Sequence, residues 1–311
     1  MKNPVKITIL LLVMFLLAQL IGIYVSSIYQ PQITQEYNQT SGNIENKTLY
    51  NIPYGFEPPE DVSPESSVAS IVIALIIAVL LMLGLMKIRA ELFLRWWFFV
   101  VVIIGIAIAL NAFLISLQYS AIIAGLIALV LAYFKVFKRN LIVHNITELL
   151  IYAGISTLFI PLLNIKTTVI LLVIISIYDM YAVWHAGFMQ KMAKYQMEKV
   201  RVFSGFFIPY ISRKDRLKIE NAKSKSKSSK KKIKVPVHLA ILGGGDVVFP
   251  MMLAGVVLAA FGPLAALIIA IGASLGLAFL FYFSQKGKFY PAMPFITIGC
   301  FIALGIVYLL H

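Results

Sequence analysis

The feature that most constrains this chain is a series of unbroken apolar runs, each about 20 residues long. A helix of that length crosses the hydrocarbon core of a bilayer, whereas a transmembrane β-strand needs only about 10 residues of alternating polarity. Charged residues make up 13% of the 311 residues, about half the fraction found in a typical soluble domain. The sequence therefore predicts an all-α, multi-pass protein of the cell membrane with nine transmembrane helices.

We divide the chain into an N-terminal membrane bundle, residues 1–163, with spans one to five, and a C-terminal membrane region, residues 164–311, with spans six to nine. The nine predicted spans cover approximately residues 6–28, 68–86, 96–117, 121–133, 148–163, 168–188, 237–261, 264–283 and 294–310.

The positive charges orient these spans. A cytoplasmic N-terminus places 25 of the 27 Lys and Arg residues on the cytoplasmic side, as the positive-inside rule requires. An odd number of spans then places the C-terminus outside. The first outer loop, residues 29–67, is acidic and rich in proline, and we expect it to be loosely ordered.

The cytoplasmic loop, residues 189–236, holds 15 Lys and Arg against 3 Asp and Glu. Most of the net charge of +14 therefore belongs to this loop. We interpret residues 223–234 of this loop as a disordered tether that lies against anionic lipid, and not as a nucleic-acid-binding surface. Its apolar stretch, residues 203–211, is expected to form an interfacial helix or a plug over a site.

Two acidic residues lie inside the predicted spans, Asp179 in span six and Asp246 in span seven. A carboxylate at the centre of a membrane helix costs about 2.5–3.5 kcal/mol on insertion scales, so such residues are usually functional. Asp179 precedes Lys191 by 12 residues, and Asp246 follows Lys234 by 12 residues. Because the two spans are antiparallel, both carboxylates lie at a similar depth, and we expect them to meet.

The backbone around Asp246 is expected to be weak. Three glycines precede this residue and Pro250 follows it. Glycine destabilises a helix interior, and Pro250 removes the helical hydrogen bond to the Asp246 carbonyl. Irregular backbone within a membrane is tolerated where it lines a water-filled cavity, so the sequence predicts a wet cavity beside Asp246.

Two carboxylates that meet are expected to share one proton, as in an aspartic protease. The ionised group accepts a proton from water, while the protonated group polarises a peptide carbonyl. This chemistry needs no metal, and the four histidines and one cysteine show no metal-ligand spacing, so no metal or cofactor is expected. Membrane carboxylates and broken helices also occur in transporters, so a proton or cation transporter or channel is the alternative.

Three short motifs resemble those of the presenilin and signal-peptide-peptidase class of intramembrane aspartyl proteases. They are Tyr178-Asp179 in span six, Gly243-Gly244-Gly245-Asp246 in span seven, and Pro291-Ala292-Met293 before span nine. The third motif has Met where the family has Leu, a swap that roughly conserves volume. The cytoplasmic N-terminus and the lack of long soluble domains resemble a compact archaeal presenilin homologue.

This resemblance implies that Asp179 and Asp246 are catalytic and that residues 164–311 form the catalytic region. The implied substrates are transmembrane segments of other membrane proteins within the lipid bilayer. A helical peptide bond is shielded from water, so the substrate is expected to unwind and to pair with exposed backbone near residues 291–294. The residues implied to contact it are Tyr178, Gly243, Gly245, Pro291, Ala292 and Met293.

Overall fold

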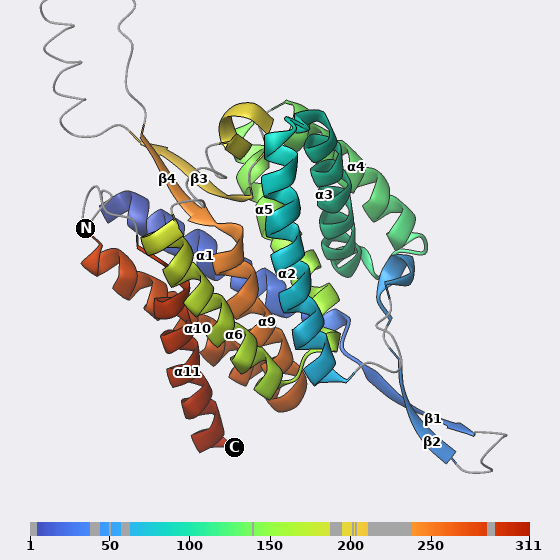
Figure 1. The fold of residues 1–311 in the computed structure, drawn as a ribbon. Helices are drawn as coiled ribbons and strands as arrows, with labels where there is room; N and C mark the ends of the chain where they lie inside the picture. The colour runs from blue at the N-terminus through green and yellow to red at the C-terminus, as the bar shows by residue number, and fades with distance from the viewer. Residues whose placement is uncertain are drawn as a thin grey trace, which may run out of the picture.

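The structure is a computed structural model that describes residues 5–37, 44–49, 51–56, 63–138, 140–186, 195–200, 202, 204–210, 238–284 and 290–311. Within these residues, nine helices are long and apolar enough to cross a membrane. The prediction of an all-α membrane protein with nine spans is therefore confirmed. The described helices are α1 (Val5–Ile28), α2 (Pro64–Lys87), α3 (Glu91–Leu114), α4 (Ser120–Phe137), α5 (Leu141–Phe159), α6 (Ile165–Tyr181), α9 (Gly244–Phe261), α10 (Pro263–Phe283) and α11 (Met293–Leu310) (Figure 1).

Several helix ends coincide with caps or turn residues in the sequence. The Ser63 side chain accepts a hydrogen bond from the Ser66 N–H at the start of α2, and Asn164 forms a capping box with Thr167 at the start of α6. Gly262 has a φ of 86° and separates α9 from α10. This left-handed conformation favours glycine, and the following Pro263 is preorganised for the first turn of α10.

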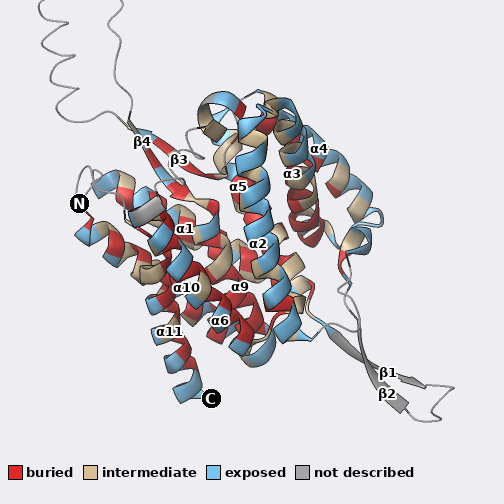
Figure 2. Cartoon of the chain, in the orientation of Figure 1, coloured by how far each residue is buried: buried red, intermediate tan, exposed pale blue. Residues whose placement is uncertain are grey.

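Helix α9 lies at the centre of the bundle. It contacts α1, α5, α6, α10 and α11, and Figure 2 shows it as the most continuously buried helix of this group. Helix α2 is the opposite case, because only Ser67 and Val68 are buried along its 24 residues. The carboxylate on α9 is thus presented from a firmly packed element, while α2 presents most of its surface outward (Figure 2).

The described part of residues 29–67, for which we predicted a loosely ordered loop, contains more order than we expected. Strands β1 (Gln32–Tyr37) and β2 (Ile44–Leu49) pair antiparallel, with Gln32 opposite Leu49 and Tyr37 opposite Ile44. A 3₁₀ turn, η1 (Pro53–Gly55), follows them. Isoleucine, threonine and tyrosine favour strands, and this preference was hidden by the overall polarity of the segment.

A second two-stranded ribbon corrects two of our expectations. Residues 205–210 form strand β3 (Gly205–Tyr210) and not a helix, and they pair antiparallel with strand β4 (His238–Gly243). The predicted span seven therefore begins as a strand, and its helix starts only at Gly244. Figure 1 shows the two ribbons at opposite ends of the helices. The basic stretch 211–237, for which we predicted contact with anionic lipid, lies outside the described residues.

Helix α5 also differs from its predicted bounds. We expected it to begin at Glu148, but it begins at Leu141, because the Asn140 side chain accepts hydrogen bonds from the N–H groups of Ile142 and Val143. Glu148 consequently lies inside the helix and not at its end, and the residue has no exposed surface. Two non-α segments, η3 (Ala182–Ala186) and η4 (Gln196–Val200), follow α6, and a short turn, η2 (Ile160–Leu162), follows α5.

Candidate active site

Asp179 lies near the end of α6 and is held by the start of α11. Its side chain is buried, and its Oδ2 atom accepts a hydrogen bond of 3.0 Å from the Met293 N–H. The Ala292 backbone N–H also donates to this carboxylate. The N-terminus of a helix favours a negative group, because its first N–H groups have no partners inside the helix. The Pro291-Ala292-Met293 motif therefore contacts Asp179 directly.

This contact explains why Met is acceptable in the third motif. The donors to Asp179 are backbone N–H groups of Ala292 and Met293, so the identity of the side chain does not decide the bond. Because these two N–H groups are engaged by Asp179, any pairing of a substrate with the backbone of residues 291–294 would have to use their carbonyl groups.

A second contact aligns α6 with α11 close to Asp179. The Ser176 Oγ and Thr297 Oγ1 atoms lie 2.8 Å apart in a hydrogen bond, and both residues are buried. Ser176 precedes Asp179 by three residues and therefore lies one turn earlier on a neighbouring part of the helix surface. Tyr178 is 38% exposed, and the α-helical geometry ends at Tyr181, where the π-helical segment begins.

Asp246 lies in the first turn of α9, and not in the middle of a membrane helix as we expected. It is the third helical residue after Gly243, which is extended (φ −66°, ψ 146°) and precedes the helix. The Gly243 backbone N–H donates to the Asp246 carboxylate. This bond resembles one half of a capping box, in which a side chain at the third position reaches back to the residue before the helix. Pro250 lies inside α9 as predicted.

The structure brings the two predicted carboxylates together. Helices α6 and α9 contact each other, and Asp179 and Asp246 interact electrostatically across that contact. Asp179 is buried, and Asp246 is partly buried. Within the described part of the chain, no group of three or more His, Cys, Asp or Glu residues is arranged to hold a metal ion.

The glycines before Asp246 have different surroundings. A Cβ atom at Gly244 would lie 2.7 Å from Ser204 Oγ and 2.8 Å from Tyr152 Cε1, whereas a Cβ atom at Gly245 would lie 3.6 Å from the Phe249 ring. At Gly243 it would lie 3.2 Å from Asp246 Oδ2. The sequence pattern drew attention to Gly243 and Gly245, and it missed Gly244, which has the closest neighbours. Only the position of Tyr152 and Ser204 in space reveals this constraint.

The structure thus combines the helices of a multi-pass membrane protein with two acidic residues on contacting helices. A family model described as signal-peptide peptidase, presenilin aspartyl protease matches residues 48–310 of the chain. The chain therefore belongs to the signal-peptide peptidase and presenilin family of aspartyl proteases, as its three motifs predicted. Its function is intramembrane aspartyl proteolysis, which takes place on membrane-protein substrates in a lipid environment.

Two solved structures share the fold, and both are described as a presenilin family intramembrane aspartate protease. The one in space group C222 has a TM-score of 0.60 and 18% identity, and the match covers 98% of this chain and 99% of that chain. The one in space group P2 has a TM-score of 0.57 and 17% identity, with 97% of each chain covered. Identities this low support the likeness of fold alone. No curated protein matches the chain in sequence.

Proposed function

We propose that Asp179 and Asp246 are the catalytic pair of this protease and that they hydrolyse peptide bonds in or near transmembrane segments of other membrane proteins. The observation that carries this proposal is that Asp179 and Asp246 lie on two contacting helices, α6 and α9, close enough for their charges to interact. Such an arrangement of two ionisable groups within membrane helices needs a functional reason, because burying charge away from water is costly.

The proposed reaction uses one water molecule and one shared proton. The ionised carboxylate accepts a proton from water, whose oxygen attacks the peptide carbonyl carbon. The protonated carboxylate donates its proton to the carbonyl oxygen, which gives a tetrahedral diol. Return of a proton to the nitrogen then breaks the C–N bond and releases an amine and a carboxylic acid. We assign the two proton states to the pair and not to either residue.

The substrate is proposed to lie extended beside β4. Among the described residues, β3 and β4 form a two-stranded sheet, so β4 has one edge that β3 does not cover. Strand β4 leads directly through Gly243 and Gly245 to Asp246. An added strand would pair its backbone with this edge and carry a peptide bond toward the carboxylates. Tyr178, Gly243 and Gly245 would then contact the substrate, while Pro291, Ala292 and Met293 hold Asp179.

The proposed entry for a transmembrane substrate lies between α2 and α6. A cavity of about 410 Å³ separates these helices, and its lining includes Val72 on α2 and Ile170 and Ile174 on α6. Tyr178 follows Ile174 by four residues and therefore lies on the same face of α6. Few residues of α2 are buried, so this helix could move aside. An apolar substrate segment could then approach this face of α6 directly from the bilayer, without crossing water.

We retain the proposed orientation, with the N-terminus in the cytoplasm of a cell membrane and the C-terminus outside. The positive-inside charge distribution supports it. In this orientation β3 and β4 lie at the cytoplasmic end and β1 and β2 at the outer end (Figure 1). Single cysteines placed in β1 and in residues 211–237 test this orientation with a membrane-impermeant reagent. In intact cells we expect labelling in β1 only. Labelling in residues 211–237 would show the opposite orientation.

The assay that tests the proposed function uses purified protein in liposomes that contain a single-span substrate. We expect two substrate fragments whose new ends lie within or next to the membrane segment, identified by mass spectrometry. The alternative function is a carboxylate-based proton or cation pathway, so ion flux is followed in parallel in the same liposomes. Flux without fragments would favour the transporter and contradict the protease assignment.

The rate of cleavage is expected to pass through a maximum as the pH changes. At low pH both carboxylates are protonated and no base remains, while at high pH both are ionised and no acid remains. The measurement is kcat against pH, and it should fall on both sides of the optimum. A rate that is constant across the range in which carboxylates titrate would contradict a shared proton, provided that a second, shorter substrate gives the same profile and so excludes slow substrate entry.

A further inference from the structure

A buried ion pair lies in the bundle away from the two catalytic candidates. The Lys135 Nζ and Glu148 Oε1 atoms are 2.6 Å apart, and the two side chains are 1% and 0% exposed. Lys135 lies on α4 and Glu148 on α5. A buried pair of this kind gains little net stability over apolar residues, because desolvation offsets the attraction. A specific structural task is therefore the better explanation for it.

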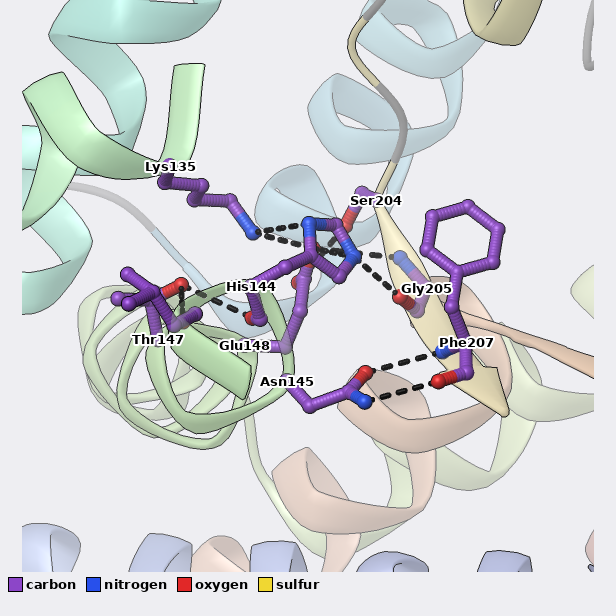
Figure 3. A network of polar contacts seen from close by, with 9 residues as sticks. Lys135, His144, Asn145, Thr147, Glu148, Ser204, Gly205 and Phe207 are labelled. Atoms are coloured by element: carbon purple, nitrogen blue, oxygen red, sulfur yellow. Dashed lines mark hydrogen bonds and ion pairs between the residues drawn. The ribbon is translucent and has the colours of Figure 1, made fainter. Parts of the chain in front are cut away.

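The ion pair belongs to a network that reaches β3 (Figure 3). The Gly205 N–H donates to Glu148 Oε1 at 3.4 Å, and the Ser204 hydroxyl donates to Glu148 Oε2 at 3.3 Å. The His144 Nε2 atom lies 2.8 Å from the Gly205 carbonyl oxygen, and its Nδ1 atom lies 3.3 Å from Lys135 Nζ. Since the carbonyl and the ammonium group have fixed roles, Nε2 is the donor and Nδ1 the acceptor in this arrangement.

The neighbouring residue on α5 holds the same strand two residues further along. Asn145 Nδ2 donates to the Phe207 carbonyl oxygen at 2.8 Å, and the Phe207 N–H donates to Asn145 Oδ1 at 3.0 Å. Gly205 and Phe207 are alternate residues, so their backbone groups lie on the same edge of β3. His144, Asn145 and Glu148 lie within about one turn of α5. Together they form hydrogen bonds with the backbone N–H and carbonyl groups of both Gly205 and Phe207, as a third strand would.

His144, Asn145 and Glu148, which hold β3 from α5, are called the α5 clamp below. The α5 clamp is connected to Asp246 through the two-stranded ribbon of β3 and β4. Gly205 is paired with Gly243, and Phe207 with Ile241, so the position of β3 determines where β4 ends and where α9 begins. Tyr152 follows Glu148 by one helical turn and stacks edge-on against Phe206, with ring centroids 5.4 Å apart. Tyr152 also borders Gly244. The path from α5 to Asp246 thus consists of contiguous hydrogen bonds and packed rings.

We infer that His144, Asn145 and Glu148, with Lys135 as the partner of Glu148, are positioning residues that set the location of Asp246 through β3 and β4. This inference rests on the proposed function, because it assumes that the location of Asp246 controls the reaction. None of the four residues is proposed to touch the substrate. Their effect is therefore expected on kcat, since a displacement of about 1 Å at a reacting group can cost on the order of 100-fold in rate.

The principal test compares Asn145→Leu with Asn111→Leu. Asn145 is half-buried, and Asn111 is buried and also hydrogen-bonded, through its Nδ2 atom to the Tyr29 hydroxyl at 2.8 Å, but Asn111 lies on α3 and contacts the residue that follows α1. Both variants lose a side-chain hydrogen bond and are expected to lower the melting temperature. Only Asn145→Leu is expected to lower kcat, by about tenfold or more, with KM changed by less than about twofold.

A second pair of variants keeps the test decisive if Asn145→Leu does not fold. The side-chain nitrogen of glutamine can take the place of His144 Nε2 and donate to the Gly205 carbonyl, whereas leucine of similar volume cannot. His144→Gln is expected to retain most of kcat, and His144→Leu is expected to lose about tenfold or more. Equal kcat values in these two folded variants, or a kcat for Asn145→Leu no lower than that of Asn111→Leu, would overturn the inference.

The outcome also separates this inference from the proposed function. If Asp179→Asn and Asp246→Asn are inactive while Asn145→Leu and His144→Leu keep the parent kcat, only the positioning role fails. If an Asp variant remains active, the catalytic assignment itself fails, and a loss of kcat in the α5 variants would then be attributed to a different site.

Discussion

Replacing Asp179 or Asp246 with asparagine is expected to abolish cleavage of a single-span substrate, with a loss in kcat on the order of 10⁴ or more, as for other hydrolases that lose a catalytic group. Asparagine has nearly the same shape but neither accepts nor donates the shared proton. Its side-chain oxygen can still accept the Met293 N–H that now bonds to Asp179. The fold should therefore survive, and thermal unfolding in detergent should show this.

Glu36→Gln provides the matched control for this experiment. Glu36 lies in β1, in the ribbon at the opposite end of the helices from β4 (Figure 1), so the substitution removes one carboxylate charge far from the pair. We expect its kcat to remain within about twofold of the parent value, since substitutions away from the reacting groups usually have small effects. Fragments produced by either Asp variant at more than about a tenth of the parent rate would contradict the catalytic assignment.

Gly244→Val is expected to produce the second large effect, on both stability and rate. The first added carbon would lie 2.7 Å from Ser204 Oγ and 2.8 Å from Tyr152 Cε1, which is too close unless these side chains or the backbone at Gly244 shift. Overpacking of this kind costs about 1–3 kcal/mol. Because Asp246 is only two residues further along, the same shift should displace its carboxylate and lower kcat by about 100-fold.

Gly245→Ala is the comparison for Gly244→Val. Its Cβ atom would lie 3.6 Å from Phe249, an ordinary contact, so its melting temperature should match that of the parent. The two variants are measured by thermal unfolding in detergent and by kcat with one substrate. If Gly244→Val unfolds at the parent temperature and retains the parent kcat, the tight packing around Gly244 does not control the site.

The membrane architecture was predictable because its signal is local. Each span is an apolar run of about 20 residues, and a bilayer permits few structures other than helices for such runs. Asp179 and Asp246 were recognisable for the related reason that a charge within an apolar run is unusual. The expectation that the two residues meet required only helix direction and distance along the chain.

The β3–β4 ribbon was not predictable in the same way. Residues 205–210 are mostly apolar, and a short apolar run does not distinguish a strand from a buried helix segment. The partner strand is separated from them by the long basic stretch, so no turn of a hairpin pointed to the pairing. As a result, we placed Asp246 inside a long helix, whereas it lies in the first turn of α9.

The α5 clamp was missed because the predicted span began only at residue 148. His144 and Asn145 fell outside that span and Glu148 was its first residue, and nothing in their composition shows that β3 covers them. One signal was available. Asn140 is a strong helix cap, and a helix that starts there places residues 144, 145 and 148 within about one turn of each other.

The support of Asp179 by the first residues of α11 has a consequence for how the protein is made. The N–H groups that hold this carboxylate come from a segment that is synthesised more than 100 residues after it. A ribosome-bound intermediate with α6 and α9 already inserted would contain both acids but would lack the donors that align one of them. The proposed catalytic pair would therefore acquire its full set of hydrogen-bond donors only after α11 has been inserted.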